Sequence, residues 1–253
     1  MNQTIGWQMD YIYFLYGLSF IMLAAVCLAM SRSERQRLPW FLLSLFIITH
    51  GLYEWIYHFS NSGTFVLSFT YFKAGLLTIS QLFLIEFGRL VFIKEGAKAP
   101  GRWIVVPFLA IAALGGLNGP SGLTAMAQYV LGFGGGFWAA LSFNRASQRI
   151  SGQARRWLES ASISMALFAA TSLLAVPPSP FFPANIFNLH WFYQTLGFHL
   201  QILRGLFIVC LNSGDQEERR FLPGYNRPEE GGGAVEISRP ARYPYRSLQS
   251  YFL

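Results

Sequence analysis

The chain alternates long apolar runs with short polar connections from residue 11 to residue 211. About 20 apolar residues, at roughly 1.5 Å each, cover the hydrocarbon core of a bilayer. The runs reach or approach this length, and their apolar residues come in blocks instead of alternating with polar ones. The pattern therefore predicts an all-α, polytopic integral membrane protein with seven transmembrane helices. We place these spans at residues 11–30, 38–59, 65–93, 103–117, 123–143, 158–176 and 187–211.

The basic residues of the connections predict the orientation of the helices. The connections after the first, third and fifth spans contain ten Lys or Arg, whereas those after the second, fourth and sixth contain none. By the positive-inside rule, the N-terminus then lies outside and the C-terminus inside. The formal charge of +7 arises from these short connections. It therefore indicates a lipid bilayer as partner, and no nucleic acid.

Composition supports this class and divides the chain into two parts. Hydrophobic residues make up 53% and charged residues only 12%, against about 25% charged in a soluble domain. Residues 1–211 form the membrane domain. Residues 212–253 are rich in Pro, Gly and charge, a composition that cannot bury a core, so we expect a cytoplasmic tail that is disordered or docks on a partner. Two cysteines indicate neither a disulfide framework nor a cysteine metal cluster.

The second apolar run carries a stripe of titratable residues. His50, Glu54 and His58 are spaced four apart, which places all three on one face of a helix. Facing lipid, each charged group would cost about 3 kcal/mol or more. The stripe should therefore point into the protein, where neighbouring helices supply partners.

Counting residues from the predicted helix ends suggests those partners. Glu54 lies five residues from the outer end of its span and Lys73 eight residues from the outer end of the next. Their levels in the membrane then agree within about 5 Å, which predicts an ion pair. Such a pair could serve chemistry, or could only fix helix packing.

A second set of polar residues is expected near the cytoplasmic side. Glu86 and Arg204 each lie seven residues from the inner end of their spans, and Arg89 lies one turn beyond Glu86. Gln201 is three residues from Arg204 and shares its face. We predict a cluster of these four residues that couples the helix interior to the C-terminal tail.

The histidines allow several interpretations. His50 and His199 both fall near the midplane of the membrane, and His58 and His190 both fall near the outer surface. Two facing histidines could bind a haem axially, and an outer pair could hold a transition metal. Hydrogen-bonded packing or a proton-responsive role explains the same residues more simply. We therefore assign no metal site, and the cofactor stays open.

Catalytic motifs are absent from the sequence. It contains no nucleophile elbow, phosphate loop or HExxH zinc motif, so we expect no enzymatic activity. Ser160, Ser162 and Ser164 are expected to form hydrogen bonds between helices. The glycine-rich segment at 132–138 should permit close helix contact or a local kink.

Five short motifs carry a resemblance to a known family. They are DYIYFLYGLSF, LPWFLLSLFIITHGLYEW, SQLFLIEFGRL, FFPANIFN and QILRGLF, in this order within residues 9–211. Through these five motifs the chain resembles the multi-helix membrane sensor region at the N-terminus of bacterial histidine kinases and diguanylate cyclases. The matching polar positions are Asp10, His50, Glu54, Trp55, Glu86, Arg89, Asn185, Asn188, Gln201 and Arg204.

The resemblance implies a sensory input module in the bacterial inner (cytoplasmic) membrane. Its last helix would feed a cytoplasmic PAS, kinase or cyclase domain. This chain departs from the family where a Pro-Val pair is expected, since it has His199 and Leu200, and no output domain follows. We therefore expect a non-enzymatic sensor or signalling module that passes a change in helix packing to a separate protein partner. The alternative is an accessory subunit of a membrane complex, holding haem, quinone or pigment between helices 2, 3 and 7. The sensing candidates are His50, Glu54, Trp55, His58, Lys73, His190 and His199.

Overall fold

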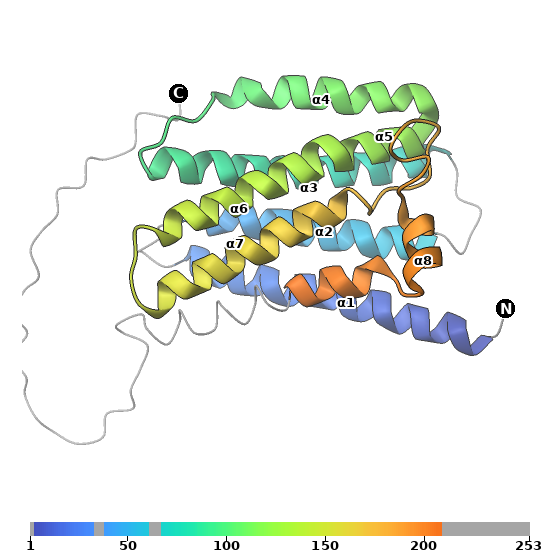
Figure 1. Cartoon of the computed structure of the whole chain (residues 1–253), viewed down its shortest axis with the longest axis horizontal. Helices are drawn as coiled ribbons and strands as arrows, with labels where there is room; N and C mark the ends of the chain where they lie inside the picture. Colours follow the sequence, from blue (N-terminus) through green and yellow to red (C-terminus); the bar gives the residue numbers. More distant parts are fainter. Residues whose placement is uncertain (1–2, 33–37, 61–66, 209–253) are drawn as a thin grey trace, which may run out of the picture.

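The described part of the chain is a bundle of long helices. The structure is a computed structural model that describes residues 3–32, 38–60 and 67–208. Its regular elements are all helical, and the long helices lie roughly parallel or antiparallel to one axis, whereas the short helix α8 lies across it (Figure 1). The all-α prediction is therefore confirmed for these residues.

The elements follow the predicted apolar runs. In chain order they are α1 (Gln3–Ser31), α2 (Trp40–Ser60), α3 (Leu67–Lys94), the 3₁₀ turn η1 (Arg102–Ile104), α4 (Val105–Leu114), the 3₁₀ turn η2 (Gly115–Asn118), α5 (Gly119–Ala127), the π-helical segment η3 (Gln128–Phe133), α6 (Gly134–Ser147), α7 (Gln153–Ser172) and α8 (Leu189–Leu196). Residues 200–208 are also helical and are called the 200–208 helix below.

Among the described residues, three stretches are long and apolar enough to cross a membrane. They are Tyr13–Ser31, Phe69–Lys94 and Arg102–Ser147. The third stretch turns back on itself before α5, where Gly119 has φ +79°, so it forms two antiparallel arms (Figure 1). Many large apolar side chains remain exposed on the outside of the bundle, which suits a surface in contact with lipid. The chain is thus a helical membrane protein.

The charged connections gather at one end of the bundle. Helices α1, α3 and α6 all finish at that end, and η2 and α7 finish at the other (Figure 1). Between two of these connections, Arg149 Nε lies 3.6 Å from Glu95 Oε2 and its Nη2 donates a hydrogen bond to the carbonyl of Glu95. The basic residues that follow α3 and α6 therefore share one end of the molecule.

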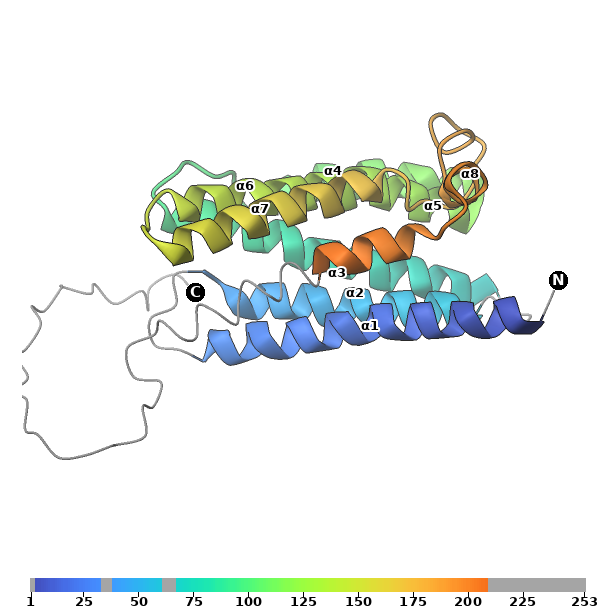
Figure 2. The same cartoon turned by 60° about the horizontal axis from the view of Figure 1, so that its bottom comes forward.

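The 200–208 helix completes a ring around the core. Around this ring α1 packs on α2, α2 on α3, α3 on α6, and α6 on α7. The 200–208 helix lies between α7 and α1 (Figure 2). A side chain on Gly205 would come within 3.4 Å of the Tyr16 ring of α1, and Ile208 belongs to the main apolar core. This placement directs Arg204 toward the middle of the bundle.

Helices α1 and α2 approach closely because each has a glycine opposite an aromatic ring of the other. The Trp55 indole occupies the space beside Gly17, where a side chain would overlap it. In the same way, a side chain on Gly51 would come within 2.8 Å of Phe20. The two contacts interlock the helices, so neither glycine has room for a larger residue.

The expected small-residue contacts are confirmed around η3 and α6. A side chain on Gly135 would come within 2.9 Å of Ile85 on α3, and one on Gly136 within 2.8 Å of Ala169 on α7. The glycines therefore let α6 approach both helices. Ser162 Oγ donates a 2.8 Å hydrogen bond to the Ala140 carbonyl, which confirms a role for this serine between helices.

The predicted seventh helix is wrong as a continuous element. A Pro-containing loop follows α7, and α8 begins after Asn188, whose side chain accepts hydrogen bonds from the backbone of His190 and Trp191. Helix α8 ends at Gly197, which has φ +75°, a left-handed conformation typical of helix C-termini. A new helix begins at Leu200. Residues 209–211 of the predicted span, and the tail at 212–253, lie outside the described residues.

The interlock of α1 and α2 makes a direct prediction. Gly17→Ala should lower the thermal unfolding temperature in detergent, because the new methyl group displaces the Trp55 ring and overpacking costs about 1–3 kcal/mol. Gly75→Ala on α3 is the matched control, since nothing lies within 4 Å of a side chain there. The control should be neutral or stabilising by up to about 1 kcal/mol. Equal effects of both substitutions would contradict the interlock.

Candidate functional site

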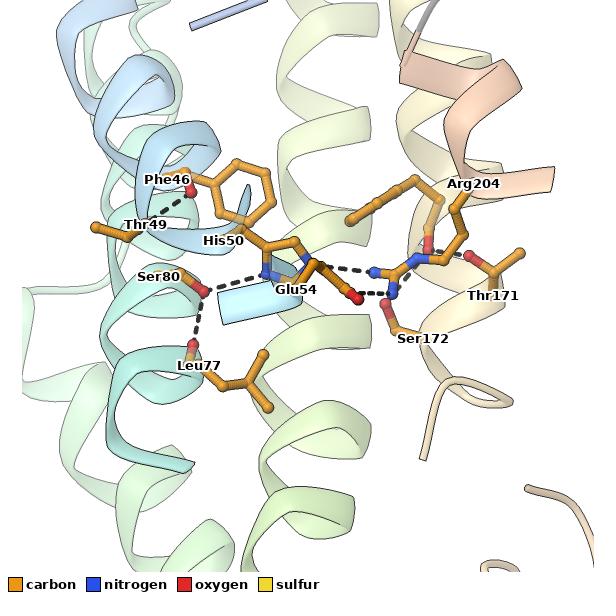
Figure 3. A network of polar contacts seen from close by, with 10 residues as sticks. Phe46, Thr49, His50, Glu54, Leu77, Ser80, Thr171, Ser172 and Arg204 are labelled. Carbon is orange, nitrogen blue, oxygen red and sulfur yellow. Dashed lines mark hydrogen bonds and ion pairs between the residues drawn. The ribbon is translucent and has the colours of Figure 1, made fainter. Parts of the chain in front are cut away.

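Arg204 is the largest fully buried side chain in the described part of the protein, with 1% of its surface exposed. Its Nη1 donates a hydrogen bond of 3.1 Å to Glu54 Oε1 on α2. The guanidinium carbon also lies 4.2 Å from the centre of the Phe168 ring of α7, a cation–π contact. Arg204 thus joins the 200–208 helix to two other helices (Figure 3).

His50 extends this network to α3. Its Nε2 lies 3.3 Å from Arg204 Nη2, and its Nδ1 lies 3.3 Å from Ser80 Oγ. Arg204 can only donate, so Nε2 acts as the acceptor and the proton of the neutral ring lies on Nδ1. Ser80 Oγ accepts the hydrogen bond from His50 Nδ1–H. Its hydroxyl group in turn donates a 2.7 Å hydrogen bond to the Leu77 carbonyl. Every contact in the chain from Leu77 to Glu54 then has one donor and one acceptor (Figure 3).

Aromatic rings enclose the network. The rings of Phe20, Phe46, Tyr53 and Phe168 lie with their centres 5.3–5.9 Å from that of His50. His50 is completely buried and Glu54 is 4% exposed. This low-dielectric setting strengthens the ion pair, but it also means that removing one partner strands a charge, at a cost of about 3–5 kcal/mol.

The expected Glu54–Lys73 ion pair is wrong. Glu54 pairs with Arg204, and its carboxylate also lies 3.5 Å from His50 Nε2. The Lys73 ammonium instead lies 5.3 Å from the centre of the Tyr57 ring and 5.9 Å from that of Phe69. Equal depth along two helices did not make the two side chains face each other, because Glu54 points toward the 200–208 helix.

The expected cluster of Glu86, Arg89, Gln201 and Arg204 divides into two separate groups. Glu86 accepts two hydrogen bonds from Arg89, at 2.6 and 2.7 Å, and lies 3.4 Å from Arg102 Nε. Gln201 and Arg204 instead line a common cavity with Glu54. The prediction failed because it rested on equal depth in the membrane, and depth does not determine which neighbouring helix a side chain faces.

Of the two possible histidine pairs, His50 and His199 contact different groups, and the pair of His58 and His190 stays untested. His199 contacts the rings of Tyr13 and Tyr193, whereas His50 uses both ring nitrogens for Arg204 and Ser80. A bis-histidine haem site between them is therefore not formed. His190 is exposed near the start of α8, and the side chain of His58 lies outside the described residues. Among the described residues no group of three or more His, Cys, Asp or Glu is arranged to hold a metal ion.

The other candidates have positions outside the network. Trp55 lies between α1 and α2 and stacks on Phe14, with ring centres 6.0 Å apart. Asn188 caps α8 and donates a 2.9 Å hydrogen bond to the Ala184 carbonyl, and Asn185 is exposed. These residues belong to the motifs that carry the family resemblance. Here Trp55 packs between two helices and Asn188 caps α8, so both have structural roles.

Sequence reasoning missed three contributors to the site: Ser80, Phe168 and Gln128. Ser80 lies beside Gln81 in a long apolar run, and nothing in its sequence context distinguishes it from a serine that faces lipid. Gln128 was the better signal, because a buried amide in an apolar span requires partners. It lies in the π-helical segment η3, a type of local distortion that often occurs at functional sites.

No protein-family model, curated protein or solved structure matches this chain. The physical arrangement is therefore the basis for a functional argument. It contains a buried ion pair and an imidazole that connect α2, α3, α7 and the 200–208 helix.

The ion pair predicts strong coupling between Glu54 and Arg204. Glu54→Gln and Arg204→Met should each destabilise the protein by about 3–5 kcal/mol, because each leaves one buried polar partner unpaired. The double variant should lose less than the sum, by about 2–3 kcal/mol. A double-mutant cycle on unfolding in detergent measures this difference.

Lys73 supplies the matched control for this cycle. Glu54→Gln combined with Lys73→Met should be additive within about 0.5 kcal/mol, because the two residues do not share a contact. The observed geometry would be contradicted if the destabilisation by the Glu54 and Lys73 substitutions were non-additive while that by the Glu54 and Arg204 substitutions was additive.

Proposed function

We propose that the protein is a non-enzymatic sensor or signalling module of seven transmembrane spans, in which the buried Glu54–Arg204–His50 network controls the position of the 200–208 helix. The observation that carries this proposal is the ion pair between α2 and that helix. A stimulus that alters the pair would change how the helix packs, and the tail that follows it would pass the change to a protein partner.

The break at Gly197 supports this role. It separates α8 from the 200–208 helix, so the latter can shift without carrying α8 along. Three residues, from Gly197 to His199, connect the two helices, and φ changes in such a short connection can absorb a hinge motion. The resemblance to the sensor region of bacterial histidine kinases and cyclases leads to the same proposal, including an inner-membrane location.

The seven spans would be α1, α2, α3, the arm from η1 to η2, the arm from α5 to α6, α7, and the helix that begins at Leu200. The basic connections after α3 and α6 lie at one end of the bundle, which would be the cytoplasmic end. The N-terminus would then lie outside and the C-terminus inside.

This topology is tested by cysteine labelling in intact cells. The background variant carries Cys27→Ala and Cys210→Ala. A membrane-impermeant thiol reagent should label Asn185→Cys, in the exposed loop before α8, and should not label Ser151→Cys, in the exposed connection before α7. Both sites should react once the cells are permeabilised. The reverse pattern, or labelling of both cysteines in intact cells, would contradict the seven-span topology.

The signalling role is tested through the partner. A photo-reactive amino acid at Leu206, which is 57% exposed on the 200–208 helix, allows cross-linking in native membranes and identification by mass spectrometry. We expect a protein with a signalling output, such as a kinase or cyclase. Arg204→Lys should change that output while the amount of cross-linked partner stays constant, because one ammonium cannot satisfy both Glu54 and His50 as the planar guanidinium does.

Two results would oppose this function. One is a cross-linked partner that belongs to a redox or transport complex, which would favour the accessory-subunit alternative. The other is an unchanged output from the Arg204→Lys variant at normal abundance, which would reduce the network to a packing role.

A further inference from the structure

A small polar cavity lies on one side of the Glu54–Arg204 pair. Its polar lining comes from Glu54, Gln128, Gln201 and Arg204, on three different elements of the fold. Its interior volume is about 10 Å³, which matches the space that a single buried water occupies. Toward the α8 end of the bundle the lining changes to Tyr57, Pro177 and Leu189, which are only half buried.

Three polar atoms in this lining lack a partner among the described residues. They are Arg204 Nε, Gln201 Oε1 and Gln128 Oε1. The side chains that carry them are 1%, 4% and 1% exposed, respectively. A buried polar atom without a hydrogen bond costs about 1–3 kcal/mol. Three in one cavity therefore indicate that a bound molecule supplies their hydrogen bonds.

The chemistry of these atoms selects a neutral molecule with both donors and an acceptor. Arg204 Nε donates, and the two glutamine oxygens accept. A water molecule would accept from Arg204 and donate to both oxygens, giving the three hydrogen bonds typical of buried water. An anion would face the Glu54 carboxylate, and a cation would face the guanidinium, so neither charge suits a lining whose own charges already balance.

We propose that this cavity is a water-binding inlet that leads from the α8 end of the bundle to the Glu54–Arg204 pair. The polar path extends further at Gly132. A side chain on Gly132 would lie 2.6 Å from Gln128 Oε1 and 3.6 Å from Gln81 Nε2, and both amide atoms of Gln81 also lack a described partner. The glycine thus leaves room for the two amide groups themselves, which approach each other where a side chain would otherwise lie.

The inlet does not depend on the signalling role proposed above. It would let the ion pair open without stranding either charge in an apolar interior, since water in the inlet can hydrate the separated groups. The two glutamines then act as fixed hydrogen-bonding groups that hold water beside the pair.

The inlet is tested with two buried cysteines on the same π-helical segment. Gln128→Cys faces the cavity, whereas Leu131→Cys replaces a residue that is 0% exposed in an apolar cluster. Both are placed in the Cys27→Ala, Cys210→Ala background and reconstituted in lipid nanodiscs, so that both membrane faces are open. The reaction followed is the exchange of the thiol proton for deuterium after transfer to D₂O, read from the infrared S–H stretching band, because this exchange needs contact with water but no space for a larger reagent.

Gln128→Cys should react faster than Leu131→Cys by about tenfold or more, because only the first site reaches water. Both sites should react fully after unfolding in detergent. No reaction at either buried site, or equal rates at both, would overturn the inlet.

A second pair keeps the test independent of any one variant. Gln201→Cys lines the cavity, and its neighbour Leu200→Cys replaces a residue that is 1% exposed in an apolar cluster and does not line the cavity. The same difference in rate is expected. If Gln128→Cys does not fold, equal rates in this second pair would contradict the proposal by themselves.

Discussion

The burial of one guanidinium in a membrane protein constrains the rest of this structure. An arginine side chain only donates hydrogen bonds, and the burial of Arg204 demands acceptors that water would otherwise provide. Glu54 and His50 on α2 supply two of them, and the Phe168 ring covers the flat face of the group. The position of the 200–208 helix, and with it the closure of the ring of helices, follows from satisfying this single charge.

The network connects parts of the chain that are far apart in sequence. Glu54 and Arg204 are separated by 150 residues, and Ser80 anchors the same network on α3. The backbone break at Gly197 has a physical role here, because it frees the 200–208 helix from the direction of α8. Under the proposed function, a helix that is anchored by a buried ion pair and begins at a short connection would respond to a change in that pair.

The fold was largely predictable because its signals are local. The apolar runs marked α1, α2, α3 and α7 to within a few residues, apart from the longer start of α1, and the stripe of His50 and Glu54 was expected to be buried. Arg204 was also expected to need a carboxylate. Which carboxylate would pair with Arg204 was not predictable. Residues counted along a helix give the depth of a side chain in the membrane, but neither the rotation of the helix nor a break within it. Neutral polar residues such as Ser80 and Gln128 gave weaker signals still, since only three-dimensional packing shows which of them face the interior.

The central claim is that Arg204, and not Lys73, neutralises Glu54 inside the bundle. Solid-state NMR on protein in lipid bilayers, with ¹³C in the glutamate carboxylates and ¹⁵N in either arginine or lysine side chains, measures this pairing by dipolar dephasing. Glu54→Gln identifies the Glu54 signal. With ¹⁵N-arginine, the Glu54 carboxyl carbon should dephase as a group in direct contact, in keeping with the 3.1 Å between Arg204 Nη1 and Glu54 Oε1, and the effect should vanish in Arg204→Met. Dephasing by ¹⁵N-lysine instead, or by arginine in the absence of Arg204, would contradict the account.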